Sequence, residues 1–239
     1  MRFLFFLVVV GALTLSAGAA YFFFGESKQD PLVAELSKFR GQVDAVLPRA
    51  SGGDVKAQFA LGKILSKANP AFRDEAKAML WYRKAADQGH IEAQFQVGTM
   101  YAAGRGTAQN YYRASEWLSL AAGLGNHRGA QFALGNLYFH GRGVPHSYGQ
   151  ALGWYRKAAA KGHPVAQHVL GLMYKEGWGL DRDPVEAFKW FSLAIPKRAE
   201  IQAQEANYDP VREREKLLVS MNRSQIERAD RLVKDWRPR

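Results

Sequence analysis

Hydrophobic positions recur along this chain with the 3.6-residue period of helices, in pairs of short segments separated by polar turns. Within residues 130–162, apolar residues fall at i, i+4 and i+7 from Ala130, and a second apolar face begins at Ala151. Two glycines and a proline lie between the two faces, at residues 141–145, where they end the first helix. The pattern predicts a helical hairpin.

The same hairpin pattern occurs four times. Each copy contains an Ala-Gln pair, a glycine four residues after the glutamine, and a tryptophan in the second helix. These residues are Ala57, Gln58, Gly62 and Trp81; Ala93, Gln94, Gly98 and Trp117; Ala130, Gln131, Gly135 and Trp154; and Ala166, Gln167, Gly171 and Trp190. The copies start 36, 37 and 36 residues apart, close to the roughly 34 residues of a tetratricopeptide hairpin. We expect the recurring tryptophans to pack between helices.

The combined motif is A-Q-x-x-L-G-x-x-Y-x-x-G-x-G-V followed by A-x-x-W-Y-x-K-A-A-x-x-G, and it resembles the Sel-1-like repeat. The resemblance covers residues 53–198. Copy one departs from it at Leu65 and at residues 67–70, and copy four departs at residues 194–197. The resemblance implies an all-α, right-handed solenoid of helical hairpins. It also implies a non-enzymatic protein, since bacterial relatives are implicated in envelope assembly, exopolysaccharide systems and signalling regulation.

The N-terminal segment carries no charge from Phe3 to Phe24. As a helix these residues would span about 33 Å, enough to cross a hydrocarbon core of roughly 30 Å. The sequence therefore predicts a single-pass inner-membrane helix with the repeats in the periplasm. Residues 17–19 also have the small-residue form of a signal cleavage site, so a secreted or periplasmic product is the alternative. The apolar aromatic run at residues 21–24 favours the uncleaved form.

Segments on both sides of the repeats are predicted to cap the array, as a solenoid requires. Asp30 and Pro31 suit a helix start, and we expect a helix over residues 31–47, covering the first repeat and broken by residues 48–53. Beyond the repeats, Asn222 and Gln225 form a predicted capping box. The domain boundaries expected are 1–24 for the membrane or signal segment, 25–52 for the linker and N-capping helix, 53–198 for the repeats, and 199–239 for the C-terminal capping helices.

Composition and charge narrow the function. The chain has 239 residues, no cysteine and a formal net charge of +11, so disulfides and thiolate metal sites are excluded. Basic residues without any acidic neighbour occupy residues 117–174, and they are candidates for an anionic polysaccharide, lipid or protein partner, although a solvated surface is the simpler explanation. These residues are Arg128, Arg142, Arg156, Lys157 and Lys161. An exported protein has no access to nucleic acid.

The sequence shows no motif typical of a phosphate-binding, metal-binding or catalytic site. The Gly-x-Gly turns have neither the strand nor the lysine of a phosphate-binding loop. Five of the six histidines cluster at His127, His140, His146, His163 and His168, but their spacing does not suit zinc, and we expect solvated turn histidines. Neither a nucleophile elbow nor converging carboxylates can be identified. We therefore expect no catalytic site, metal or cofactor, and a cell-wall hydrolase is a minor alternative.

Partner-binding residues are expected on the first helix of each hairpin, which lines the inner curve of related solenoids. Positions free of packing there, together with a tryptophan expected to be exposed in the last glycine turn, are the candidates. They are Phe95, Thr99, Phe132, Asn136, Phe139, His168, Leu172, Lys175 and Trp178. The sequence thus favours a membrane-tethered scaffold that binds a protein or peptide in its groove.

Overall fold

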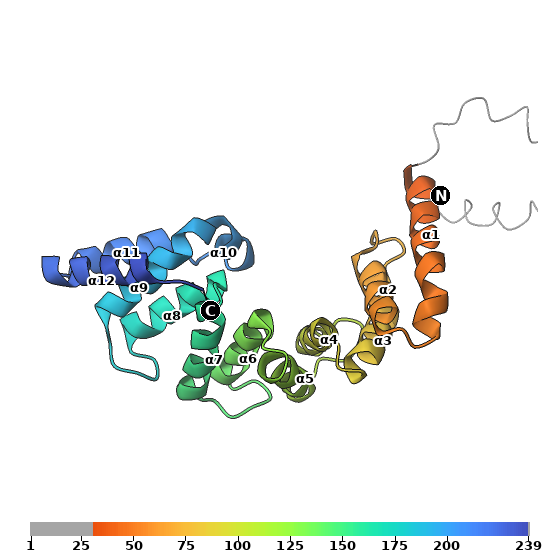
Figure 1. Cartoon of the computed structure of the whole chain (residues 1–239), viewed down its shortest axis with the longest axis horizontal. Helices are drawn as coiled ribbons and strands as arrows, with labels where there is room; N and C mark the ends of the chain where they lie inside the picture. Colours follow the sequence, from red (N-terminus) through yellow and green to blue (C-terminus); the bar gives the residue numbers. More distant parts are fainter. Residues whose placement is uncertain (1–30, 239) are drawn as a thin grey trace, which may run out of the picture. The chain divides into compact units, whose positions relative to one another are not determined.

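The computed structural model describes residues 31–238, and the secondary structure in that range is helical throughout (Figure 1). The helices are α1 (Pro31–Ser51), α2 (Val55–Lys67), α3 (Glu75–Asp87), α4 (Ile91–Ala103), α5 (Tyr111–Gly123), α6 (Arg128–His140), α7 (Tyr148–Ala160), α8 (Pro164–Glu176), α9 (Pro184–Ala194), the 3₁₀ turn η1 (Ile195–Lys197), α10 (Arg198–Gln204), α11 (Pro210–Leu218) and α12 (Arg223–Asp235). The chain divides into two compact units, residues 1–42 and 43–239. The first of these is described only from residue 31.

The predicted membrane segment, residues 3–24, lies outside the described residues. Within residues 31–238, no helix is both long enough and apolar enough to cross a bilayer.

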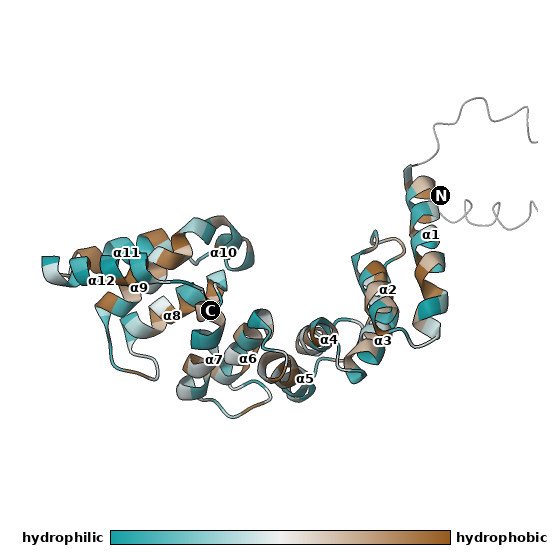
Figure 2. Ribbon diagram, viewed as in Figure 1, coloured by the Kyte–Doolittle hydropathy of each residue, from teal (hydrophilic) through white to brown (hydrophobic). Residues whose placement is uncertain are grey.

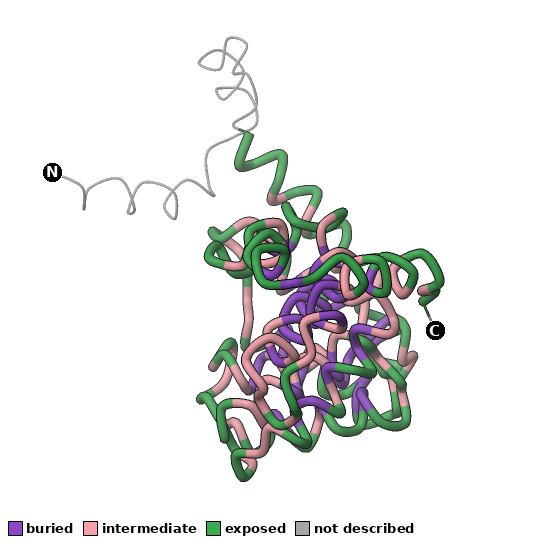
Figure 3. Tube along the Cα trace, turned by 90° about the vertical axis from the view of Figure 1, so that its left-hand side faces the viewer, coloured by how far each residue is buried: buried purple, intermediate pink, exposed green. Residues whose placement is uncertain are grey.

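Helices α2 to α9 form four consecutive hairpins. Each first helix packs against its own second helix, and each second helix packs against the first helix of the next hairpin. Apolar and polar residues share every helix (Figure 2), and buried residues gather where the helices of residues 43–239 face one another (Figure 3). The predicted all-α solenoid of helical hairpins is confirmed.

Helix α1 is longer than predicted. It continues through Pro48 to Ser51, so the break expected at residues 48–53 is wrong over residues 48–51. The chain turns at Gly53, whose φ of 93° suits glycine. Among residues 43–51 only Ala50 is buried, and Leu47 is exposed. Within residues 43–51 the contact with the first repeat lies in the last turn, where the carbonyl of Ala50 accepts a hydrogen bond from Gln58 Nε2 at 3.3 Å.

The two glycines of the recurring Gly-x-Gly turns have different structural roles. Gly141 ends α6 in the left-handed conformation, with φ of 63°, which a residue with a side chain rarely adopts. Gly143 lies against the start of the preceding second helix, and a Cβ there would be 2.3 Å from the carbonyl carbon of Tyr111. The first glycine thus stops a helix, and the second lets neighbouring repeats touch.

The Ala-Gln pair binds each repeat to the helix before it. Gln131 is 1% exposed, and its Nε2 donates to the carbonyl of Ala122 at the end of α5, at 3.2 Å. Gln94 and Gln167 make the equivalent bonds to Ala86 and Ala159. Because a buried amide without a partner is costly, this pairing fixes how successive hairpins join.

The recurring tryptophans are less buried than expected. Trp190 is 8% exposed, but Trp81, Trp117 and Trp154 are only half-buried. The residue that follows each tryptophan fills the core instead; in the third hairpin this is Tyr155, at 1% exposure. The packing prediction is therefore correct for the fourth copy and displaced by one residue in the others.

The C-terminal helices close the array as predicted. Helix α10 packs on α8, and both α11 and α12 pack on α9. Asn222 and Gln225 form the expected capping box at the start of α12. Leu217 and Met221 are buried, whereas Leu218 is 38% exposed. The last repeat therefore does not present its apolar face to solvent.

Replacing Gly135 by alanine should destabilise the protein. Its Cβ would lie 2.7 Å from the ring of Tyr155, which is held by a hydrogen bond to Asn136, so we expect a loss of about 1–3 kcal/mol in the free energy of unfolding. Gly153→Ala is the matched control, because nothing lies within 4 Å of that position and alanine should stabilise helix α7 by about 0.5–1 kcal/mol. Urea denaturation measures the free energy of unfolding of both variants, and equal effects would contradict the close approach of Gly135 to the Tyr155 ring.

Candidate functional site

Five of the nine predicted partner-binding residues line one cavity, which we call the aromatic pocket. Its volume is about 230 Å³, and it lies among α6, α7, α8, the turn after α8 and the segment between α10 and α11. The predicted residues in its lining are Phe132, Asn136, Phe139, Leu172 and Trp178. The residues that the sequence did not identify are His140, Tyr155, Val165, Val169, Glu205 and Tyr208.

Aromatic rings supply most of the pocket's surface and hold one another in place. Phe139 lies edge-on to Trp178, with ring centroids 5.4 Å apart, and Phe132 lies 5.7 Å from Tyr155. The Tyr155 hydroxyl donates to Asn136 Oδ1 at 2.6 Å, and burial raises the pKa of that phenol above its ordinary value of about 10. The rings of the lining thus contact one another, and Tyr155 is held by a hydrogen bond.

Trp178 differs from its prediction. The sequence placed it exposed in a glycine turn, but it is half-buried and packs against Phe139 and Tyr148. The ring folds back because Phe139 and Tyr148 offer an apolar surface that the turn itself lacks. It contributes a wall to the pocket instead of a free contact.

His168 was predicted to face the groove, and this is wrong. It is 1% exposed, with its ring 4.6 Å from that of Tyr208 and 5.3 Å from that of Phe191. Burial lowers its pKa to about 4, against a weaker opposing effect from Glu213 and Asp209. The C-terminal segment that carries Tyr208 covers this position.

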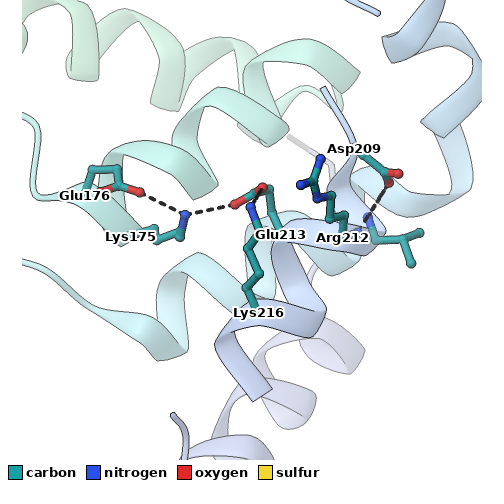
Figure 4. A network of polar contacts seen from close by, with 7 residues as sticks. Lys175, Glu176, Asp209, Arg212, Glu213 and Lys216 are labelled. Carbon is teal, nitrogen blue, oxygen red and sulfur yellow. Dashed lines mark hydrogen bonds and ion pairs between the residues drawn. The ribbon is translucent and has the colours of Figure 1, made fainter. Parts of the chain in front are cut away.

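Lys175 also forms ion pairs within the fold. Its Nζ lies 2.9 Å from carboxylate oxygens of both Glu176 and Glu213 (Figure 4), and Glu213 also pairs with Lys216. The two lysines lower the pKa of Glu213 despite its partial burial. This network joins α8 to α11, so Lys175 supports the C-terminal cap.

Phe95 and Thr99 lie one repeat earlier, on α4, and do not line the aromatic pocket. Phe95 is half-buried with its ring 4.5 Å from that of His127. Thr99 Oγ1 donates to the carbonyl of Gln96 at 2.9 Å. The groove predicted along three repeats thus contains a defined cavity in the last two, and Phe95 and Thr99 lie outside that cavity.

The five basic candidates do not form one patch. Lys157 and Lys161 line a cavity of about 360 Å³ with Asn126 and Gln131, and Arg128 donates to the Lys161 carbonyl at 3.3 Å. Arg142 lies over the ring of Tyr111, on a separate turn. Arg156 lines a different cavity, of about 490 Å³.

Histidine has a structural role that the sequence analysis missed. His90, His127 and His163 are the N-cap residues of α4, α6 and α8, and each Nδ1 accepts a hydrogen bond from a backbone N–H three residues on. Each ring lies 4.4–4.6 Å from a phenylalanine of the preceding first helix, namely Phe59, Phe95 and Phe132. The expectation of solvated turn histidines is therefore wrong for His127 and His163. The sequence signal for this role is a histidine three residues before the alanine of the Ala-Gln pair in copies two to four. Copy one has Asp54 at the same position.

The chemistry available at the aromatic pocket is that of recognition. Ring faces can receive an apolar side chain, and Glu205 adds one carboxylate at the lining. In the part of the chain that the structure describes, no three His, Asp or Glu residues gather closely enough to hold a metal ion.

Comparison with known proteins identifies the repeats. The family described as Sel1 repeat matches residues 55–90, 91–126, 129–163 and 164–195. A crystal structure of a Sel1 repeat protein from Oxalobacter formigenes is similar, with a TM-score of 0.60 and 26% identity over 82% of this chain and 87% of that one. The protective antigen c5321 of uropathogenic Escherichia coli, which displays an SLR fold, gives a TM-score of 0.68 and 28% identity over 88% of this chain. This chain spans 42% of that protein.

Acid should weaken the fold through two histidines. Burial lowers the pKa of both His163 and His168 to about 4, whereas in the unfolded chain each binds a proton at about 6.5. The unfolded state therefore holds more protons as pH falls from about 6.5 toward 4, and each histidine should reduce the free energy of unfolding by about 2 kcal/mol between pH 7.5 and 5.

Urea denaturation at those two pH values tests this expectation. His163→Asn keeps an N-cap acceptor and removes one titrating group, so its loss of stability on acidification should be about 2 kcal/mol smaller. The exposed His146, replaced in the same way, serves as the control. A pH dependence that is unchanged in His163→Asn would show that burial of this histidine does not govern acid sensitivity.

Proposed function

Because this chain belongs to the Sel1 repeat family, whose repeats form protein-interaction scaffolds and are generally non-catalytic, we propose that it is a membrane-tethered adaptor of the bacterial envelope. In this proposal its right-handed solenoid lies in the periplasm and holds a protein or peptide partner. The uncharged residues 3–24 would supply the tether. A tether confines the search to two dimensions and raises the effective concentration toward membrane partners.

The aromatic pocket is the observation that carries the binding proposal. Phe132 and Phe139 lie on α6 and Trp178 lies in the turn after α8, yet their side chains line one cavity of about 230 Å³. Interfaces place their most important contacts in such desolvated pockets, where a single apolar or aromatic side chain of the partner can be buried. Glu205 at the lining favours a partner segment with a basic residue beside that side chain.

Site-specific crosslinking in native envelopes tests the pocket. A photoreactive residue at His140, which is exposed and lines the pocket, should capture the partner. The same residue at Gly153, exposed on α7 with no close neighbour, should capture much less. Equal capture at both positions would contradict binding through the pocket.

The captured partner, once purified, allows the contribution of the rings to be measured. Phe139→Glu should weaken binding by about ten-fold or more, because a charge would enter a desolvated contact. Phe139→Leu, which keeps the apolar character, should weaken it less, and Gln150→Ala on the exposed start of α7 should leave it unchanged. Thermal unfolding of each variant separates lost binding from lost folding, and unaltered affinity in a folded Phe139→Glu protein would refute the proposal.

The location is tested independently by reporter fusions at the C-terminus. Alkaline phosphatase fused after Arg239 should be active and a fluorescent protein that folds only in the cytoplasm should be dark, because residues 3–24 would carry the repeats across the membrane. Deleting residues 3–24 should reverse both readings. A bright cytoplasmic reporter on the full chain would exclude the periplasmic placement.

A further inference from the structure

A second cavity, which we call the basic cavity, is formed by α7, α8, α9 and the end of α12, and has a volume of about 490 Å³. Its size falls in the range of small-ligand sites, roughly 300–1,000 Å³. It shares no lining residue with the aromatic pocket. It is lined by Arg156, Ala160, Tyr174, Glu186, Lys189, Trp190, Asp235, Trp236 and Arg237.

Two of its three cations have no carboxylate to neutralise them. Arg156 Nη2 donates to the Tyr174 hydroxyl at 2.8 Å, and Arg237 Nη1 donates to the backbone carbonyls of Lys234 and Trp236, both at 2.7 Å. Within residues 31–238, neither guanidinium forms an ion pair. Each keeps further N–H donors for an anion, and carboxylates bind the guanidinium fork in a bidentate manner.

The two acidic residues of the cavity differ in their ion-pair partners. Glu186 is occupied, since it pairs with Lys189 and accepts a hydrogen bond from Trp190 Nε1 at 3.0 Å. Asp235 is exposed and has no ion-pair partner among the described residues. The cavity therefore combines strong donors with one carboxylate still available as an acceptor.

Flat apolar surface completes the cavity. Trp236 is half-buried after the end of α12 and lies close to the turn between α7 and α8, where a Cβ on Gly162 would be 3.9 Å from its ring. Tyr174 is also half-buried, with the guanidinium of Arg156 5.6 Å from its ring centre. Aromatic faces are electron-rich and attract the weakly positive C–H groups of a ligand.

These features together select an acidic sugar. A phosphate group has no C–H face for Trp236, and with a charge of about −1.5 to −2 it would be repelled by Asp235 more strongly than a singly charged carboxylate. A neutral sugar would leave the two guanidinium groups uncompensated. A uronate ring has a carboxylate for Arg156 and Arg237, hydroxyls that need both donors and acceptors, and a C–H face for Trp236. We propose that the basic cavity binds a uronate unit of an acidic oligosaccharide, independently of any partner in the aromatic pocket.

Calorimetric titration of the full chain with a trimer of galacturonic acid tests this proposal. We expect saturable binding at millimolar or lower concentration, at least ten-fold weaker binding of neutral maltotriose, and little competition from equimolar inorganic phosphate. An absence of saturation, or equal displacement by phosphate, would overturn the proposal, the latter by showing a general anion site.

Two adjacent residues of α7 provide a matched pair of variants. Arg156→Gln removes a cation from the cavity and should weaken trimer binding by about ten-fold. Lys157→Gln removes the same charge, but Lys157 lies over Trp154 and lines a different cavity, so affinity should change less than two-fold. Equal losses in the two variants would mean that diffuse positive charge, and not this cavity, attracts the sugar.

Discussion

The close crossing of the two helices in every hairpin is the constraint on which the rest of the structure depends. At Gly62, Gly98, Gly135 and Gly171 a Cβ would lie 2.7 Å from a side chain of the second helix, which is a tyrosine, leucine or phenylalanine. Glycine lets the backbones approach, and the facing side chain then fills the crossing. In the second to fourth hairpins a second turn glycine, at Gly106, Gly143 or Gly179, allows the turn to meet the preceding hairpin.

The position of the aromatic pocket follows from these close helix crossings. Tyr155 sits in the crossing at Gly135, and its hydroxyl reaches Asn136, so one side of the ring is fixed by the fold while its edge lines the pocket. The C-terminal cap supplies Glu205 and Tyr208 to the same lining. The cap therefore has two effects: it covers the last repeat, including His168, and it contributes lining residues to the aromatic pocket.

The repeated hairpin also explains why some residues that stabilise the fold line a binding surface as well. The histidine N-caps orient Phe59, Phe95 and Phe132 by ring contact, and Phe132 belongs to the pocket lining. Polar caps and aromatic stacking thus hold the first helices at fixed spacing, while the second helices α7 and α9 carry Arg156 and Lys189 of the basic cavity, and Arg237 follows α12. Two surfaces of different chemistry, one aromatic and one basic, can therefore be built on a single repeated unit.

The sequence by itself determined the features that depend on local or periodic patterns. Hairpin register, turn glycines, the capping box at Asn222 and the alignment of Phe132, Asn136 and Phe139 on one helical face all follow from spacing within a few turns of helix. Only the tertiary structure decided that Tyr155 is more buried than Trp154, that Trp178 folds onto Phe139, and that Tyr208 covers His168. These outcomes depend on contacts between residues up to 40 positions apart, such as His168 with Tyr208, and nothing in the local pattern of either segment specifies its neighbour in space.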